Sequence, residues 1–297
     1  MALACFPVPR LFAVLLATAA AAGLTVAVAQ ERHDDPGQPQ APERQQLPAP
    51  DLAIPRSPAR LASTLTATTR RLRDALRRWD AASDLPRDVT YLALHHQRML
   101  RLMAARRALG DATLARLPRD VRGEARDTVL GRRQLAAIPH SPGRLPRVRV
   151  AEAAPAAQLR RYYATAQRRF GVHWSLLASI NFVESAFGRV RSASEAGARG
   201  PMQFLPSTWR EYGMGGDIDD PRDAILAAAN YLRRAGAPRH IDRALLAYNH
   251  STAYVRAIRR FADRMRADAR AYLAYYAWQV FVRTPTGVRR LTGPGRG

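Results

Sequence analysis

The chain of 297 residues contains one cysteine, no lysine and only three asparagines. Because Cys5 is the single cysteine, an intramolecular disulfide is excluded, and the fold has to be stable without one. The 47 basic residues are therefore all arginine, and this bias, together with abundant alanine, indicates a GC-rich coding sequence. The asparagines, Asn181, Asn230 and Asn249, all lie within one stretch of the second half, which draws attention to that stretch.

Acidic residues are also scarce, which leaves a formal net charge of +23. The excess is spread evenly, with 23 arginines against 13 acids in residues 30–150 and 23 against 11 in residues 151–297. A nucleic-acid-binding protein more often gathers its charge into a patch with interleaved aromatic residues, so we expect no nucleic-acid partner. An anionic wall polymer or a membrane surface is the expected partner of such a chain if it is exported, and a merely solvated basic surface is the alternative.

Residues 1–29 have the layout of a secretory signal peptide. Arg10 precedes an almost wholly apolar run over residues 11–28, and the small residues of Ala27-Val28-Ala29 form a cleavage site before Gln30. The pattern predicts an exported, extracytoplasmic protein that is secreted or associated with the cell wall. The alternative is an uncleaved membrane anchor, since 18 apolar residues are just long enough to span a bilayer.

Helical periodicity dominates the rest of the chain, and only residues 148–150 hint at a strand. The sequence predicts an all-α protein with a disordered Pro-rich segment, a helical N-terminal module, a linker, a helical catalytic domain and a frayed tail. These are residues 30–58, 59–137, 138–157, 158–282 and 283–297, respectively. The first two helices of the module have buried stripes, namely Leu61, Leu65, Thr68, Leu72, Leu76 and Trp79, followed by Val89, Leu92, His96, Met99 and Met103. Adjacent His95 and His96 point in different directions on a helix, so we expect His96 in the core and His95 on the surface rather than a metal site.

Glu184 stands in an apolar helix that begins near His173, between Ile180 and Phe187 on the edge of the buried face. An ionised carboxylate is rarely buried without a partner, and no arginine is suitably spaced to pair with it. Desolvation would raise the pKa of this carboxyl and keep it protonated near neutral pH, as a general acid requires. The alternative is a glutamate whose tip reaches solvent at the helix end.

Two segments after this helix have the residue types of a sugar-binding site. The Gly-rich loop "SASEAGARGPMQFLPSTW" (residues 192–209) sets the amide of Gln203 between Met202 and Phe204, which suits a ligand with hydroxyls at its edges and apolar faces. The segment "ALLAYNHS" then ends an apolar helix with Tyr248 and Asn249. The aromatic run over residues 272–281 could stack on sugars, but such a run is more often core.

Taken in order, Glu-Ser-x-Phe, Gly-Pro-Met-Gln-Phe-x-Pro-x-Thr-Trp and Ala-Tyr-Asn-His-Ser resemble the motifs of the soluble lytic transglycosylases, lysozyme-like enzymes that cleave peptidoglycan. The resemblance covers residues 158–282 and implies a lysozyme-like fold with a glycan groove. It implies that Glu184 is the catalytic acid and base and that the groove is bordered by substrate-binding residues, namely Ser194, Met202, Gln203, Phe204, Tyr248 and Asn249. Pro201 departs from the aliphatic residue of many relatives. The N-terminal module is only loosely similar to actinobacterial-type members.

Residues 158–282 offer one acid in an apolar setting, whereas a glycosidase that uses water ordinarily needs two carboxyls. The acids of the loop "GGDIDDP" do not fit a calcium site, because the twelfth position is not Glu; Asp220 instead predicts a helix N-cap before Pro221. We therefore expect no metal and no cofactor. The sequence favours a transglycosylase that cuts the MurNAc–GlcNAc bond and closes a 1,6-anhydro ring, with a lysozyme-type hydrolase or a non-catalytic wall-binding protein as alternatives.

Overall fold

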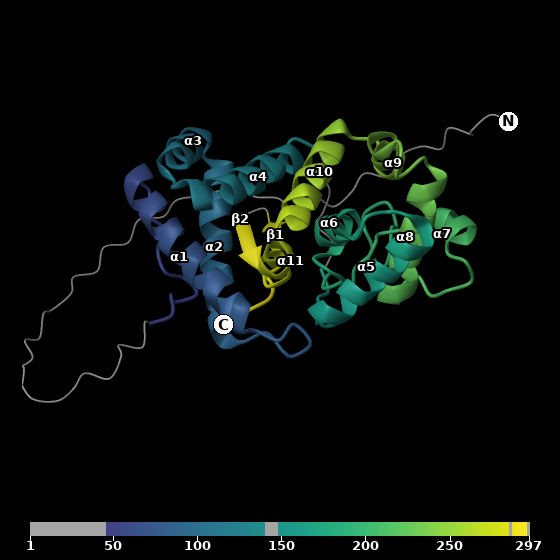
Figure 1. Cartoon of the computed structure of the whole chain (residues 1–297), viewed down its shortest axis with the longest axis horizontal. Coiled ribbons are helices and arrows are strands. Elements are labelled where there is room, and N and C mark those ends of the chain that lie inside the picture. Colours follow the sequence, from purple (N-terminus) through teal and green to yellow (C-terminus); the bar gives the residue numbers. More distant parts are fainter. Residues whose placement is uncertain (1–45, 140–147, 285–286, 296–297) are drawn as a thin grey trace, which may run out of the picture.

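The computed structural model describes residues 46–139, 148–284 and 287–295. The secondary structure of these ranges is almost wholly helical, as predicted, and contains one short hairpin that was not predicted (Figure 1). The elements are α1 (Pro58–Arg78), α2 (Arg87–Ala105), α3 (Arg107–Arg116), α4 (Arg119–Ala136), α5 (Ala156–Phe170), α6 (Trp174–Ser185), α7 (Pro206–Tyr212), α8 (Pro221–Arg234), α9 (Ile241–Tyr248), α10 (Thr252–Ala267), α11 (Ala269–Tyr276), β1 (Phe281–Thr284) and β2 (Gly287–Arg290). The predicted signal peptide lies outside the described residues.

Helices α1 to α4 gather at one end of the molecule and α5 to α9 at the other, with α10 and α11 between them (Figure 1). Helix α10 packs against α4 on one side and against α6 on the other. The apolar side chains of both ends join into one continuous buried cluster. Packing from both halves of the chain therefore fixes the position of α6, the helix that carries Glu184.

The predicted stripes of α1 and α2 are confirmed, because every residue of both stripes is buried. Helix α1 begins with an N-cap and a proline in its first turn. The Ser57 side chain accepts a hydrogen bond from the Arg60 amide, and Pro58 is the first helical residue. A break at Pro118 separates α3 from α4. The prediction for His95 was wrong, because both histidines are buried; α2 is covered on more than one face, so a single stripe understates its burial.

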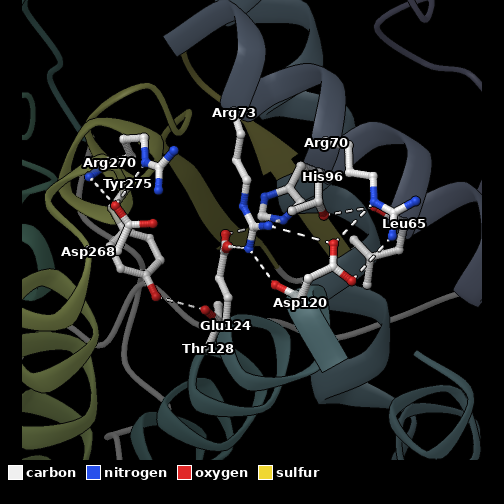
Figure 2. A network of polar contacts seen from close by, with 11 residues as sticks. Leu65, Arg70, Arg73, His96, Asp120, Glu124, Thr128, Asp268, Arg270 and Tyr275 are labelled. Atoms are coloured by element: carbon white, nitrogen blue, oxygen red, sulfur yellow. Dashed lines mark hydrogen bonds and ion pairs between the residues drawn. The ribbon is translucent and has the colours of Figure 1, made fainter. Parts of the chain in front are cut away.

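A polar network joins α1, α2 and α4 beside this apolar cluster (Figure 2). Arg73 of α1 donates to Glu124 of α4 over 2.8 Å, and Nε2 of His96 lies 3.8 Å from the same carboxylate. At the end of the network, Thr128 of α4 and Tyr275 of α11 share a hydrogen bond of 2.7 Å. The Thr128–Tyr275 bond in Figure 2 is thus a polar contact that ties an N-terminal helix to a C-terminal one, in addition to the shared apolar cluster.

Two stretches predicted to be irregular are held in place. Residues 46–57 belong to the segment expected to be disordered, yet Arg98 of α2 donates to the carbonyls of Pro50 and Leu52. Strands β1 and β2 pair as an antiparallel hairpin in the predicted tail, and Leu291 after it is buried and donates its amide to Val280. The strand hint before α5 corresponds to an isolated bridge between Val150 and Val190.

Candidate active site

Helix α6 is buried almost all round, and this decides the environment of Glu184. Its first turn is capped by His173, whose Nδ1 accepts a hydrogen bond from the Ser175 amide. Ten of its twelve residues are buried, and Phe182 and Val183 are the half-buried exceptions. The sequence placed Glu184 at the edge of one apolar face; because α6 is covered from several sides, its carboxyl is enclosed, with only 3% of the residue exposed.

The C-terminus of α6 is fixed by a set of polar contacts just beyond Glu184. Ser185 donates to the Pro201 carbonyl over 2.5 Å and accepts from the Gly188 amide over 2.8 Å. Asn181, one turn earlier, donates to the same carbonyl over 2.8 Å and accepts from the Tyr163 hydroxyl over 2.6 Å. These contacts tie the Glu184 turn to the loop that carries Met202 and Gln203.

The backbone after Glu184 is strained, which points to a constrained position. Ala186 and Phe187 both have positive φ angles, of 52° and 64°, and residues other than glycine rarely adopt this backbone conformation. Phe187 is nevertheless fully buried, and its ring stacks on Phe182 with the centroids 5.6 Å apart. Packing of this ring offsets the strain and holds the chain in its sharp turn at the end of α6.

One hydrogen bond reaches the Glu184 carboxyl. The Tyr254 hydroxyl donates to Oε1 over 2.7 Å, whereas Oε2 is buried without a hydrogen-bond partner among the described residues. Burial raises the pKa of Glu184 from 4.5 to about 8, and the bond from Tyr254 opposes that shift in part. The carboxyl is therefore predominantly protonated at pH 7 and can donate a proton from an enclosed, largely apolar position.

Two tyrosines, Tyr248 and Tyr254, surround this carboxyl. The Tyr248 hydroxyl donates to the Met202 carbonyl over 2.6 Å, which places it where α9 meets the Met202–Gln203 loop. Burial raises the pKa of both tyrosines well above the ordinary value, and the nearby Glu184 carboxyl raises it further. Both hydroxyls consequently stay protonated and serve as hydrogen-bond donors at neutral pH.

No charged residue in the described part of the chain pairs with Glu184, although arginine is so abundant. Two acids of the loop after α7 have partners other than Glu184. Asp219 forms an ion pair of 2.7 Å with Arg199, and Asp220 caps α8 by accepting from the Asp223 amide, as predicted. No second carboxylate among the described residues therefore affects the pKa of Glu184.

The other predicted site residues divide by burial. Met202 and Phe204 are buried, and Phe204 packs edge-on against Trp209 and Tyr248. Gln203 between them is half-buried, with a φ of 50° that turns its side chain away from its two neighbours; its amide donates to the Gly200 carbonyl over 3.0 Å. Of these three, Gln203 is the one with side-chain surface left for a ligand.

Ser194 and Asn249 have different surroundings from Gln203. Ser194 is buried, and its hydroxyl accepts from the Ala198 amide over 3.0 Å, which closes the turn of the Gly-rich loop. Asn249 is buried at the C-terminus of α9, directly after Tyr248. Their predicted contact with substrate stays a prediction, and for Ser194 the structure supplies a loop-forming role.

Tyr254 was not singled out from the sequence. It is the third residue of α10, and Ser251 caps that helix by accepting from the Tyr254 amide over 3.3 Å. The Asn-His-Ser-Thr-Ala-Tyr order, a cap followed three residues later by a tyrosine, is the signal that could have found it. The pairing with Glu184, 70 residues earlier, depends on how α10 packs on α6.

The described residues contain no group of three or more His, Cys, Asp or Glu side chains that could hold a metal ion. The same part of the chain contains no helix both long and apolar enough to cross a membrane.

Part of the chain that carries this site is similar to known proteins. Residues 161–270 match the model of the transglycosylase SLT domain. A curated relative, the "Membrane-bound lytic murein transglycosylase F" of Thiobacillus denitrificans (strain ATCC 25259 / T1), is 31% identical over 122 residues, which cover 38% of this chain and 26% of the relative. This chain thus spans about a quarter of the length of that relative. No solved structure matches the chain significantly. The similarity of the N-terminal module to actinobacterial-type members stays a prediction.

Proposed function

We propose that this chain, whose residues 161–270 belong to the transglycosylase SLT domain family, is a peptidoglycan lytic transglycosylase with Glu184 as its catalytic acid and base. The observation that carries the proposal is the enclosed Glu184 carboxyl, with a pKa raised to about 8 and with Oε2 free of any partner among the described residues. Such a group holds a proton at neutral pH and can give it to the glycosidic oxygen of a substrate.

The first step of the reaction is protonation of the leaving oxygen at the MurNAc–GlcNAc bond by Glu184. The carboxylate that forms is stabilised by the Tyr254 hydroxyl at Oε1, 2.7 Å away. The same carboxylate then removes the proton of the 6-hydroxyl of the muramyl sugar, whose oxygen attacks the anomeric carbon. The C–O bond to GlcNAc breaks, a 1,6-anhydro ring closes, and Glu184 regains its proton.

The intramolecular route suits a site with a single carboxylate. A lysozyme-type hydrolase would need a second carboxyl or an equivalent base to act on water or on the sugar. Asp219 and Asp220 of the loop after α7 are engaged with Arg199 and with the start of α8, and no other carboxylate in the described part of the chain influences the pKa of Glu184. The 6-hydroxyl is already tethered to the reacting sugar, so no positioned water is required.

Gln203, Tyr248 and Asn249 are the proposed substrate contacts around Glu184. Gln203 has a half-buried amide on a turn fixed at positive φ, and Tyr248 joins α9 to this turn. Met202 and Phe204 support the turn from the buried side, and their contribution to substrate binding is through its shape.

The product tests the proposal. Purified sacculi are digested with the full chain, treated with borohydride, and the muropeptides are weighed. We expect fragments that end in 1,6-anhydro-MurNAc, which borohydride does not reduce and which are one water lighter than hydrolysed ends. Reducible muramic ends as the main product would assign the chain as a hydrolase, and no turnover would favour a wall-binding protein.

The matched variants separate the role of Glu184 from a general loss of charge. Glu184→Gln keeps the shape and removes the titrating proton, and we expect activity to drop about a hundredfold or more. Glu195→Gln makes the same change at an exposed position of the Gly-rich loop and should keep wild-type activity. Comparable turnover in the two variants would remove Glu184 from the mechanism.

We also infer that the chain acts outside the cytoplasmic membrane, where peptidoglycan lies. The named relative is membrane-bound, and the first 29 residues of this chain have the pattern of an export signal. Its net charge of +23 would favour contact with anionic wall polymers or with a membrane surface. Mass analysis of the protein from its host should give a mature N-terminus at Gln30; an intact Met1 would favour the anchored alternative.

A further inference from the structure

A cavity lies between the N-terminal helices and the outer side of α6. It has a volume of about 60 Å³, and its wall includes Arg101 of α2, Arg132 of α4, Phe182 and Val183 of α6 and Trp278 after α11. The two arginines come from the N-terminal half, whereas the other three residues belong to the half that carries the candidate active site. The cavity therefore opens where the two halves of the molecule meet.

Three donor nitrogens of the cavity wall have no hydrogen-bond acceptor among the described residues. Nε and Nη2 of Arg132 and Nε1 of Trp278 are buried without a partner among the described residues. Arg101 is 5% exposed and Arg132 is 7% exposed, and neither forms an ion pair with any carboxylate that the structure describes. Guanidinium and indole N–H groups can only donate hydrogen bonds. They therefore cannot bond to one another, and each needs an acceptor from elsewhere.

The remaining polar side chains of the wall are already occupied. Gln97 donates to the Gln279 carbonyl and accepts from its amide, and the Gln279 side chain donates to the Ala277 carbonyl. The Tyr275 hydroxyl is bonded to Thr128. These contacts hold the framework of the cavity in place and leave the Arg132 guanidinium and the Trp278 indole as its unsatisfied donors, with the buried Arg101 beside them.

The positive charges of Arg101 and Arg132 are also poorly compensated. Burial lowers the pKa of Arg132 to about 10, and burial together with the charge of Arg132 lowers the pKa of Arg101 well below its ordinary value. Their closest charge-stabilising neighbours are aromatic rings: Arg101 lies over Phe281 at 4.0 Å and Arg132 over Trp278 at 5.5 Å. An aromatic face stabilises a buried cation less than a carboxylate with good geometry does, so positive charge is left over.

We propose that this cavity is a binding site for a carboxylate group, held by Arg101, Arg132 and the indole N–H of Trp278. A planar carboxylate accepts two parallel hydrogen bonds from one guanidinium and can take further donors on its outer lone pairs. The volume of about 60 Å³ is that of roughly two water molecules in the liquid, which fits a carboxylate with little more attached. The aromatic wall accommodates the carbon to which the carboxylate is bound.

The bound carboxylate would bridge the two halves of the molecule. Val183 and Ala186, which both line the cavity, flank Glu184 in the sequence, and α4 supplies Arg132 from the opposite wall. The carboxylate source is either a small organic acid or the carboxyl end of a peptide, and both present the same group to the arginines. The site is separate from the Glu184 carboxyl, so it does not depend on the proposed reaction.

Binding of ¹³C-carboxyl-labelled propionate to the full chain tests the proposal. The label is followed by NMR at fixed ionic strength, and N-acetylalanine is titrated in parallel as a mimic of a peptide end. We expect saturable binding of propionate by the wild type, at least tenfold tighter than chloride or phosphate measured by competition. Tighter binding of N-acetylalanine than of propionate would identify a peptide end, and the reverse a small organic acid.

Variants locate the binding. Arg132→Met and Arg101→Met should each weaken propionate at least tenfold, whereas Arg126→Met removes the same charge from an exposed position of α4 and should leave affinity unchanged. Arg132→Lys keeps the charge without the planar fork and should weaken binding less than Arg132→Met does. Equal affinity in Arg126→Met and Arg132→Met, or phosphate bound more tightly than propionate, would overturn the proposal.

Unfolding distinguishes a ligand site from a structural pair of arginines. Without ligand, Arg132→Met should have an unfolding midpoint no lower than wild type, because it removes a buried charge that lacks a partner. Propionate should raise the midpoint of the wild type and of Arg126→Met but not of Arg132→Met. A midpoint of Arg132→Met well below the wild type, with no propionate effect on either protein, would mean that Arg132 is only a packing residue.

Discussion

Replacing Glu184 by glutamine should make the protein more stable near neutral pH while it abolishes activity. The enclosed carboxyl has a pKa of about 8 in the folded protein against an ordinary value of 4.5, mainly because burial disfavours its charge. A group whose pKa is raised by folding favours the folded state below its unfolded pKa. That contribution is lost as the pH rises from about 4.5 through about 8.

The size of the effect follows from the two pKa values. Each pKa unit corresponds to about 1.4 kcal/mol, so the wild type loses about 5 kcal/mol of this contribution by the time Glu184 is ionised in both states. At pH 7 the unfolded chain is already ionised at this position, and the loss is about 3 kcal/mol. Glutamine does not titrate, and its oxygen can still accept the bond from Tyr254, so the variant avoids this loss.

The assay is urea unfolding of wild type and Glu184→Gln at pH 4.5 and at pH 7, followed by near-UV circular dichroism. From pH 4.5 to pH 7, the free energy of unfolding of the variant should rise by about 3 kcal/mol relative to that of the wild type. This change does not depend on how stable the variant is at pH 4.5. The exposed Glu195→Gln variant should change by less than about 0.5 kcal/mol. A difference near zero for Glu184→Gln would show that the carboxyl titrates normally, and the argument for a protonated acid at pH 7 would fail.

Two further predictions concern the groups around α6. Tyr254→Phe removes the donor to Glu184, so the basic limb of the pH–activity profile should move upward by roughly one pH unit or more, and an unmoved limb would contradict that contact. Gly131→Ala should lower the free energy of unfolding by about 1–3 kcal/mol, because a Cβ there would lie 2.8 Å from the Phe261 ring. Gly123→Ala on the same helix meets nothing within 4 Å and should raise it by up to about 1 kcal/mol; equal effects of the two substitutions would refute this view of the α4–α10 contact.

Where a helix buries one face and leaves the opposite face to water, its sequence predicts which residues are buried. The stripe of α1 is an example, since Leu61 and Leu65 are fully buried at the spacing that the pattern requires. The N-cap at Asp220 was predictable for a related reason, because a cap is a local interaction of neighbouring residues. His95 could not be placed this way, since α2 is covered by other helices on a second face that no local pattern reveals.

The candidate site was predictable in its types of residue and less so in its contacts. The misfit of Glu184 in an apolar helix pointed to a desolvated acid, and its burial and raised pKa agree with that argument. Tyr254 escaped notice because its relation to Glu184 arises from packing between α10 and α6. The resemblance implied that Ser194 borders the groove, and only the folded loop reveals that its hydroxyl accepts a hydrogen bond from the Ala198 amide.

The role of the N-terminal helices follows from how α10 is held. Tyr254 reaches Glu184 from the first turn of α10, so the position of that helix sets the hydrogen bond to the carboxyl. On its other side α10 lies against α4, where the missing side chain of Gly131 lets the Phe261 ring approach the helix closely. A close fit of this kind leaves little room for α10 to shift. The N-terminal helices thus help to hold Tyr254, and through it Glu184, in place, although none of their described residues forms a hydrogen bond with Glu184.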